Sequence, residues 1–254
     1  MSAEARIVDA LPEVFHVRRV PGARRGVVFV HGVMSHAGWF ERLSSALAEQ
    51  GISSIAVDRR GSGSARGMDG VLDSRAWIDD VRSAQAYLRE RGAQVAVVGW
   101  CWGARLAVVA ATVDPPDQLI LVAPGLAMAP LVRARAAALA TTTEDPAPLP
   151  FGPELFSSRP EILRWITDDP LAWRDQPRAF QATSRGLLDQ ALSVLPTLTV
   201  PLATILADAD RIIDNAGVEK LVATHPIIRV PGEHALVLES PGAVARELIA
   251  LLVS

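Results

Sequence analysis

The stretch VAVVGWCWGARLAVVAA (Val95–Ala111) changes its pattern at its midpoint, where the only cysteine of the chain, Cys101, stands. The first half is a continuous apolar run typical of a buried strand, and the second half has the composition of a helix. The joint reads Gly99-x-Cys101-x-Gly103. Glycines at these positions let the strand and the helix approach each other closely, around a sharp turn. The pattern therefore predicts a strand–turn–helix unit that presents Cys101 at the carboxyl edge of a sheet.

The same alternation of apolar runs and helical patterns continues along most of the chain. Strands that are apolar throughout are typical of a parallel sheet covered on both faces. We therefore predict an α/β fold, a mostly parallel twisted sheet with helices on both faces. A further one or two edge strands are expected before Gly26. The predicted strands lie at 26–32, 53–58, 94–99, 118–124, 200–208 and 226–232, and the helices between them at 37–51, 74–92, 102–112, 215–225 and 241–253.

The alternation stops between residues 126 and 198, where no strand pattern is found. An Ala-rich helix at 131–140 is expected there, followed by a Pro-rich stretch and helical pieces at 162–166, 170–173 and 180–195. A break of this length predicts a helical lid or cap inserted into the core. Residues 1–125 and 199–254 would then form the α/β core.

Composition limits the function classes. The chain has 254 residues, half of them hydrophobic, and a formal net charge of −3, so bulk charge does not favour a nucleic-acid partner. No apolar run is long enough to span a bilayer, and the N-terminus lacks the apolar core of a secretory signal. A single cysteine forms no internal disulfide, and we expect a cytoplasmic protein. No phosphate-binding loop or metal-ligand spacing is found, so no cofactor or metal is expected, and the oligomeric state is left open.

Cys101 has two interpretations from its surroundings alone. A lone cysteine among apolar residues is often a small core residue. At a strand–helix turn it is instead a candidate nucleophile, because a helix N-terminus favours a thiolate and a developing oxyanion. His31-Gly32 closes an earlier strand and leads into a loop. We name the N–H groups of Val33 and Trp102 as candidate oxyanion-hole donors, although an ordinary strand–helix turn would also explain the loop.

An acid and a histidine follow in the order that a nucleophile of this kind requires. Carboxylates at Asp208, Asp210 and Asp214 follow a late strand, and His234 follows the last strand after a Pro-Gly turn. A histidine can act as the base and a carboxylate can orient it. The chain order of nucleophile, acid and histidine is the one expected for this architecture, whereas a lone loop histidine is more often a solvated residue. His16 and His225 are interpreted as surface residues.

The segments FVHG (29–32), DRRGSGSA (58–65), GWCWG (99–103), ADADRIID (207–214) and GEHALVLE (232–239) resemble the α/β-hydrolase family. The resemblance covers the chain from Gly26 onward. HGVMSHAGWF (31–40) and the insertion are most similar to the monoacylglycerol lipase and lysophospholipase branch. That resemblance implies an α/β-hydrolase fold with Asp210 as the triad acid, ahead of Asp208 and Asp214. Most of the family has serine as the nucleophile, whereas dienelactone hydrolases are similar to this chain in having cysteine.

A Cys101-His234-Asp210 triad would form a thioester acyl-enzyme, open to attack by water, alcohols, amines or thiols. We expect a cofactor-independent hydrolase or acyltransferase (an esterase, thioesterase, lactonase or cyclising enzyme) within secondary metabolism. Its substrate would be a small acyl compound, either free or linked to CoA or a carrier protein. Candidate substrate-binding residues are Met34, Trp39, Trp100 and Met128, with His36, Trp102 and Trp173 as further candidates; core packing is the alternative for these aromatic residues. The alternative of another class is a cyclase or lyase without acyl chemistry, or a binding protein, because fold alone does not determine function.

Overall fold

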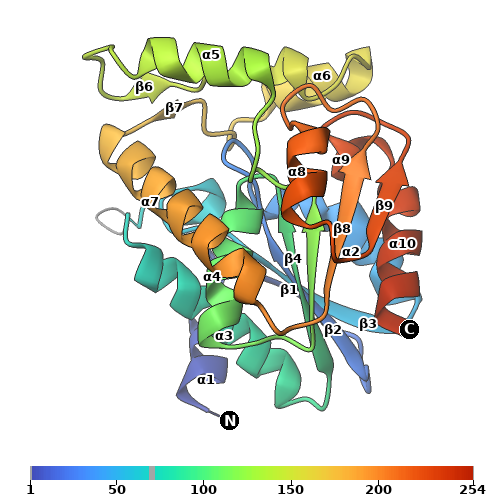
Figure 1. Cartoon of the computed structure of the whole chain (residues 1–254). Coiled ribbons are helices and arrows are strands. Elements are labelled where there is room, and N and C mark those ends of the chain that lie inside the picture. Colours follow the sequence, from blue (N-terminus) through green and yellow to red (C-terminus); the bar gives the residue numbers. More distant parts are fainter. Residues whose placement is uncertain (1, 69–71, 254) are drawn as a thin grey trace.

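A seven-stranded sheet forms the centre of the molecule, with the strand order β1-β3-β2-β4-β5-β8-β9 (Figure 1). The computed structural model describes residues 2–68 and 72–253. All neighbouring strands of this sheet run parallel except β1, which pairs antiparallel with β3 at one edge. The strands are β1 (Phe15–Arg18), β2 (Arg25–Val30), β3 (Ile52–Val57), β4 (Gln94–Trp100), β5 (Gln118–Val122), β8 (Leu202–Ala207) and β9 (Ile227–Val230).

Helices cover both faces of the sheet, as the apolar strands predict. On one face α1, α3, α4 and α7 pack in sequence, and on the other α2 packs against α10 (Figure 1). The helices of the core are α1 (Ala3–Ala10), α2 (Glu41–Glu49), α3 (Ser74–Arg89), α4 (Gly103–Val113), α8 (Asn215–Leu221), α9 (Leu236–Glu239) and α10 (Pro241–Val253). Two 3₁₀ turns, η1 (Ala37–Phe40) and η2 (Gly63–Ala65), accompany them. The arrangement is the α/β-hydrolase fold, and the predicted fold class is confirmed.

The segment between β5 and β8 lies over the carboxyl ends of the parallel strands. In Figure 1 α5 and α6 form a layer above the points of the arrows, and α7 descends along one side of the core. The elements of this segment are α5 (Pro130–Leu139), β6 (Ala147–Pro148), η3 (Pro153–Leu155), α6 (Pro160–Asp168), β7 (Asp175–Gln176), α7 (Arg178–Val194) and η4 (Leu195–Thr197). The boundary prediction of 126–198 itself stays a prediction.

Local predictions differ from the structure in three places. The N-terminal α1 was not predicted, because its eight residues are too few for apolar spacing to indicate a helix. The expected helical piece at 170–173 is instead a turn at Pro170 and Leu171, after which the chain runs into β7. The segment predicted to lack strands contains a small antiparallel pair, Ala147↔Gln176 and Pro148↔Asp175. Pairs of two residues have no periodicity that a sequence pattern could reveal.

Candidate active site

Cys101 occupies a strained turn between β4 and α4. Its φ is 54°, in the left-handed region that residues other than glycine seldom adopt. The flanking glycines allow the turn, as predicted: a Cβ on Gly99 would lie 2.7 Å from Ala104 Cα, and one on Gly103 only 2.1 Å from the Val30 carbonyl oxygen. The turn therefore holds the thiol at the carboxyl edge of the sheet, against the amino end of α4.

Asp210 and His234 follow the neighbouring strands β8 and β9, so their loops meet at the same edge. His234 Nδ1 lies 2.8 Å from Asp210 Oδ2, and both side chains are fully buried. The other carboxylate oxygen of Asp210 accepts hydrogen bonds from Ile212 N–H at 2.8 Å and Ile213 N–H at 2.9 Å. The carboxylate is thereby held in one orientation toward the imidazole.

The two alternative acids lie elsewhere. Asp208 is half-exposed and forms an ion pair with Arg229 at 3.5 Å. Asp214 caps α8, where it accepts a hydrogen bond from Gly217 N–H at 3.1 Å. Of the three carboxylates considered from the sequence, the structure therefore brings only Asp210 into contact with His234.

The free nitrogen of His234 is directed to the thiol. Its Nε2 is buried and has no hydrogen-bond partner of regular geometry within residues 2–68 and 72–253. Burial opposes protonation of His234, but Asp210 and Cys101 overcome that effect and raise its pKa to about 10. Asp210 and Cys101 both interact electrostatically with the His234 imidazole, so the three side chains lie close together.

Trp100 packs against the His234 ring and is not among the residues that line the cavity beside Cys101. Its ring centroid is 5.6 Å from the His234 ring, and its Nε1–H donates to the His234 carbonyl at 3.3 Å. Phe156 packs edge-on against the same imidazole at 5.1 Å. Phe156 was not named from the sequence, since it lies far from the triad motifs in the chain. The two aromatic rings hold the imidazole in place and exclude water from it.

A cavity of about 410 Å³ opens from Cys101 between the core and the segment above it. Val33, Trp102 and Met128, all named from the sequence, line it. Met34, Trp39 and Trp100 are not among its lining residues; all three are buried in the core. Their large apolar side chains pack behind the loop and the imidazole, which is the core-packing alternative. His36 and Trp173 likewise lie outside the cavity wall.

The predicted oxyanion loop lies against the nucleophile. A Cβ on Gly32 would be 3.5 Å from Cys101 Sγ, which shows how closely the loop approaches the sulfur. Within the part of the chain that the structure describes, neither Val33 N–H nor Trp102 N–H donates a hydrogen bond to protein. Both groups are therefore free to donate to a ligand atom.

Arg59 supports this loop from an aromatic cage, a feature that sequence reasoning missed. Its guanidinium lies 4.6 Å from the Trp102 ring centroid and 4.7 Å from that of Phe180, with Trp77 and Trp173 also in range. Its Nη2 donates to the Val33 carbonyl at 3.3 Å. Burial lowers the pKa of Arg59 to about 9, against the attraction of Asp58. The cage thus anchors the residue that carries one proposed oxyanion donor.

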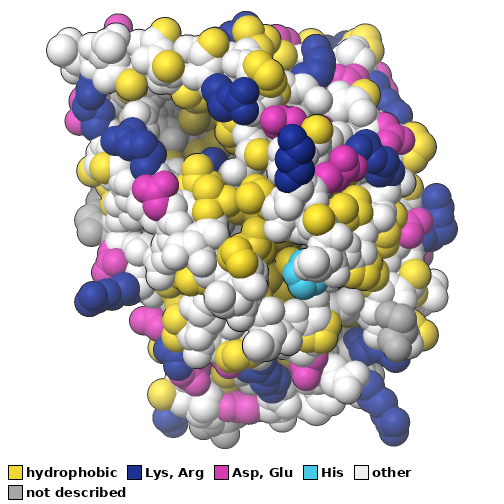
Figure 2. All heavy atoms as spheres, in the orientation of Figure 1, with side chains coloured by type: hydrophobic (Ala, Val, Ile, Leu, Met, Phe, Trp, Pro, Cys, Tyr) yellow, Lys and Arg dark blue, Asp and Glu magenta, His cyan; other side chains and the backbone are white. Residues whose placement is uncertain are grey.

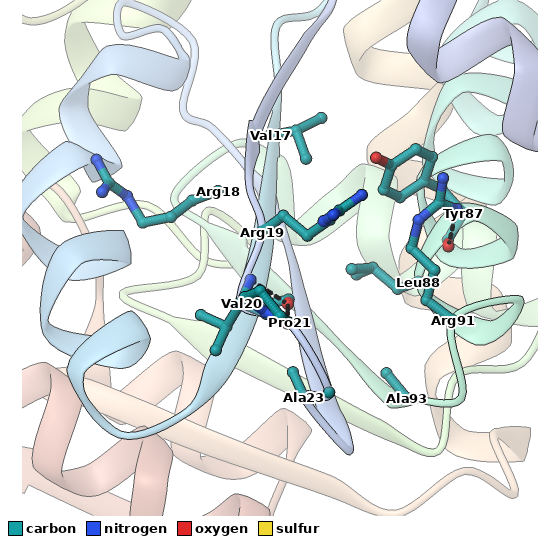
Figure 3. A pocket seen from close by; sticks show the side chains of 12 residues that line it. Val17, Arg18, Arg19, Val20, Pro21, Ala23, Tyr87, Leu88, Arg91 and Ala93 are labelled. Carbon is teal, nitrogen blue, oxygen red and sulfur yellow. Dashed lines mark hydrogen bonds between the residues drawn. The ribbon is translucent and has the colours of Figure 1, made fainter.

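A second hollow, of about 230 Å³, lies between the β1–β2 connection and α3 (Figure 3). Arg19, Tyr87 and Arg91 face it, and the Arg91 guanidinium stacks on the Tyr87 ring. None of its described lining residues carries a carboxylate, an imidazole or a thiol. Its hydroxyl groups, on Ser53 and Tyr87, therefore have no lining carboxylate or imidazole to act as a general base. Among the described residues, no cluster of three or more His, Cys, Asp or Glu side chains is arranged to hold a metal ion.

Comparisons with known proteins place the chain in a family. A family model described as serine aminopeptidase, S33 (Hydrolase_4), matches residues 21–229. The chain therefore belongs to this family of α/β-hydrolases. The family's name refers to serine, whereas this chain has cysteine at the strand–helix turn. No curated protein matches the sequence. In the described ranges, no helix is both long and apolar enough to cross a membrane.

Solved structures with low sequence identity share the fold. Monoacylglycerol lipase from Paleococcus ferrophilus is 20% identical, with 94% of this chain and 97% of that chain covered and a TM-score of 0.78. A soluble variant of monoglyceride lipase from Saccharomyces cerevisiae is 15% identical, with 94% and 90% covered and a TM-score of 0.75. The thioesterase domain from the curacin biosynthetic pathway is 19% identical, with 90% and 92% covered and a TM-score of 0.61.

Proposed function

We propose that this protein is an acyl hydrolase or acyltransferase that acts on an ester, thioester or lactone through Cys101, His234 and Asp210. The observation that carries the proposal is the alignment of the three groups. A buried Asp210 holds one nitrogen of His234, the other nitrogen lacks a regular partner, and Cys101 lies at the strained turn beside it. Family membership and the lipase, esterase and thioesterase names among the structural neighbours support ester chemistry.

The raised pKa of His234 favours its imidazolium form before substrate binds, so His234 holds the proton that it later delivers. In the first half-reaction Cys101 Sγ attacks the acyl carbon, and the N–H groups of Val33 and Trp102 stabilise the oxyanion. One such donor typically contributes about 3 kcal/mol to transition-state stabilisation. The carbon–leaving-group bond then breaks as His234 delivers its proton to the leaving oxygen or sulfur, which leaves a thioester on Cys101.

In the second half-reaction His234 takes a proton from water or from another acceptor, and the acceptor attacks the thioester carbon. The carbon–sulfur bond breaks, the acyl product leaves, and the proton remains on His234 beside the thiolate. The same cycle gives hydrolysis with water and acyl transfer with an alcohol, amine or thiol. No cofactor takes part in these steps. Residues 126–198 would act as the cap that shields the thioester from bulk water.

The test uses the single cysteine of the chain. Iodoacetamide should label Cys101 and abolish turnover of p-nitrophenyl esters and acyl thioesters, and Cys101→Ala should be inactive. Asp210→Asn should lower kcat by about 10³–10⁴-fold, because the imidazole loses its orienting charge. Asp208→Asn is the matched control and should keep activity, since Asp208 lies on the surface in an ion pair with Arg229.

Full activity of Cys101→Ala would end the proposal. Tight binding of a small molecule without turnover by the wild-type protein would favour the alternative of a non-hydrolytic enzyme or binding protein. Addition of an alcohol, amine or thiol separates the two forms of the main proposal, because only a transferase diverts the acyl product. A role in secondary metabolism, and a substrate linked to CoA or a carrier protein, remain predictions.

A further inference from the structure

Three arginines from three separate elements reach the wall of the Cys101 cavity. Arg105 comes from α4, one turn after the nucleophile, Arg133 from α5 and Arg185 from α7. None of the described residues that line this cavity is an aspartate or a glutamate. The chain as a whole carries a net charge of −3, so the cavity concentrates positive charge against the balance of the molecule. Figure 2 shows a hollow beneath the upper layer, with hydrophobic surface inside and Lys or Arg side chains at its rim.

Arg105 is the innermost of the three. Its Nε–H donates to the Gly125 carbonyl at 2.8 Å, and its Nη1 donates to Ser184 Oγ at 3.1 Å. Ser184 also accepts the Trp102 indole N–H at 2.7 Å, which ties the arginine to the nucleophile turn. Nη2 makes no hydrogen bond within residues 2–68 and 72–253, and it is not sealed from the cavity. Burial lowers the pKa of Arg105 to about 10, and Asp189, which opposes that effect, lies outside the cavity wall.

The other two arginines lie closer to solvent. Arg133 is mostly exposed, and its one ion pair with a described residue is long, at 3.7 Å from Asp214. Arg185 is exposed and has neither a hydrogen bond nor an ion pair among the described residues. Apolar residues fill the wall between the arginines, among them Met128, Val132, Leu149, Phe151 and Leu188.

From this arrangement we propose that the cavity selects an anionic acyl substrate: an apolar acyl body whose reacting carbonyl meets Cys101 while a carboxylate or phosphate of the same molecule binds the arginines. Guanidinium groups form short, charge-assisted hydrogen bonds with both kinds of oxyanion. The anion has two sources, a carboxylate at the far end of the acyl group or the phosphates of a CoA leaving group. The inference rests on the proposed function for the identity of the reacting group, but the charge preference can be measured without turnover.

The first experiment compares kcat/KM for three thioesters: octanoyl-N-acetylcysteamine, the equivalent thioester of suberic acid with its second carboxyl free, and octanoyl-CoA. At least one anionic thioester should exceed the neutral one by roughly tenfold, the size of one charge-assisted contact. An advantage of the suberate derivative identifies a carboxylate on the acyl group, and an advantage of the CoA derivative identifies the phosphates. A neutral thioester that performs as well as both would overturn the inference.

Variants connect the preference with the arginines. Arg185→Gln and Arg105→Gln should each lower the ratio of anionic to neutral kcat/KM, and the ratio compensates for general losses of activity. The matched control is Arg19→Gln, which removes the same charge from the exposed wall of the second hollow and should leave the ratio at its wild-type value (Figure 3). An unchanged ratio in both cavity variants would contradict the assignment. Thermal unfolding checks that each variant folds.

A binding arm separates failure of this inference from failure of the proposed function. Calorimetry on Cys101→Ala compares monomethyl suberate, an anion, with dimethyl suberate, its neutral match. Tighter binding of the anion by roughly tenfold, lost on adding Arg185→Gln, supports the inference even where the wild-type protein turns over no thioester. Equal binding of the two esters, together with octanoyl-CoA that reacts no faster than the neutral thioester, overturns the inference, and turnover of the neutral thioester by the wild-type protein then leaves the proposed function standing.

Discussion

Cys101 shows how much of the site depends on one backbone conformation. A φ of 54° at a residue with a side chain stores strain that the surrounding structure must hold. The strained turn places Cys101 in the wall of the cavity, although the residue is only 2% exposed overall. The core-packing interpretation of Cys101 is therefore right about its burial, while its orientation and its electrostatic contact with His234 favour the nucleophile.

His31 is a second residue whose protonation state the structure dictates. Its Nδ1 lies 2.7 Å from the Gly32 carbonyl and its Nε2 accepts the Arg59 N–H at 3.0 Å. A ring that donates at one nitrogen and accepts at the other is neutral. Burial, with the positive charge of Arg59, lowers the pKa of His31 to about 3. The neutral ring joins the loop of Val33 to the loop after β3.

The stability of the protein should therefore depend on pH through His31. The unfolded chain protonates this histidine below about pH 6.5, whereas the folded protein resists protonation down to about pH 3. The contribution of neutral His31 to the free energy of unfolding is complete above pH 6.5 and is lost as the pH falls from 6.5 toward 3. Between pH 7.5 and pH 4, the free energy of unfolding measured in urea should fall more steeply for the wild-type protein than for His31→Gln. The control His225→Gln, which changes a half-exposed histidine, should keep the wild-type slope; equal slopes for wild type and His31→Gln would refute the prediction.

At the scale of elements, the crossing of β4 and α4 decides where the nucleophile lies. Val30 of β2 pairs with Gly99 of β4, so the loop that follows β2 begins beside the turn that carries Cys101. Gly103 sits against the Val30 carbonyl, and Gly99 sits against α4. No side chain fits at either position, because backbone atoms occupy the space.

Gly103→Ala should accordingly destabilise the protein by about 3 kcal/mol or more, since the added methyl group would meet a backbone oxygen that cannot move aside. The matched control is Gly186→Ala in the middle of α7, where an added Cβ meets nothing within 4 Å. That change should stabilise the protein by about 0.5–1 kcal/mol through helix propensity. Urea unfolding measures both, and similar free energies for the two variants would contradict the close-approach argument.

The long elements were predictable because each has a helical period or a continuous apolar run, whereas the short elements have neither. The helices α3 and α10 and the parallel strands follow directly from apolar spacing. The pair β6–β7 and the turn at 170–173 arise from contacts with the rest of the segment: the Leu149 N–H bonds the Arg174 carbonyl, and Trp173 N–H bonds the Met34 carbonyl at 2.8 Å. Such contacts join residues far apart in the chain and leave no local pattern.

At the scale of the whole molecule, a buried carboxylate joins the segment above the sheet to the core. Asp169 Oδ2 lies 3.0 Å from His36 Nε2 and accepts the Trp39 indole N–H at 2.8 Å. Trp39 in turn packs against Trp100, which supports the His234 ring. His36 and Trp39, considered from the sequence as pocket residues, thus contribute to the attachment of the segment and to the support of the imidazole.

Asp169→Ala should lower the free energy of unfolding by about 2–4 kcal/mol, because it removes the partner of two buried nitrogen atoms, His36 Nε2 and Trp39 Nε1. The matched control is Asp168→Ala, one residue away and exposed, which should change stability by no more than about 0.5 kcal/mol. Chemical unfolding followed by tryptophan fluorescence measures both. Equal stabilities for the two variants would show that Asp169 does not join the segment above the sheet to the core.

The sequence by itself determined the order of the elements, the α/β class, the turn that carries Cys101 and the chain order of nucleophile, acids and histidine. These features depend on local spacing, which periodicity and glycine positions express directly. The resemblance to α/β-hydrolases placed Asp210 ahead of Asp208 and Asp214, but only the tertiary structure decided which carboxylate reaches His234, because that depends on the path of the loop. It alone also decided that Trp100 supports the imidazole and that arginines from α4, α5 and α7 meet in one cavity, since such contacts form when distant segments pack.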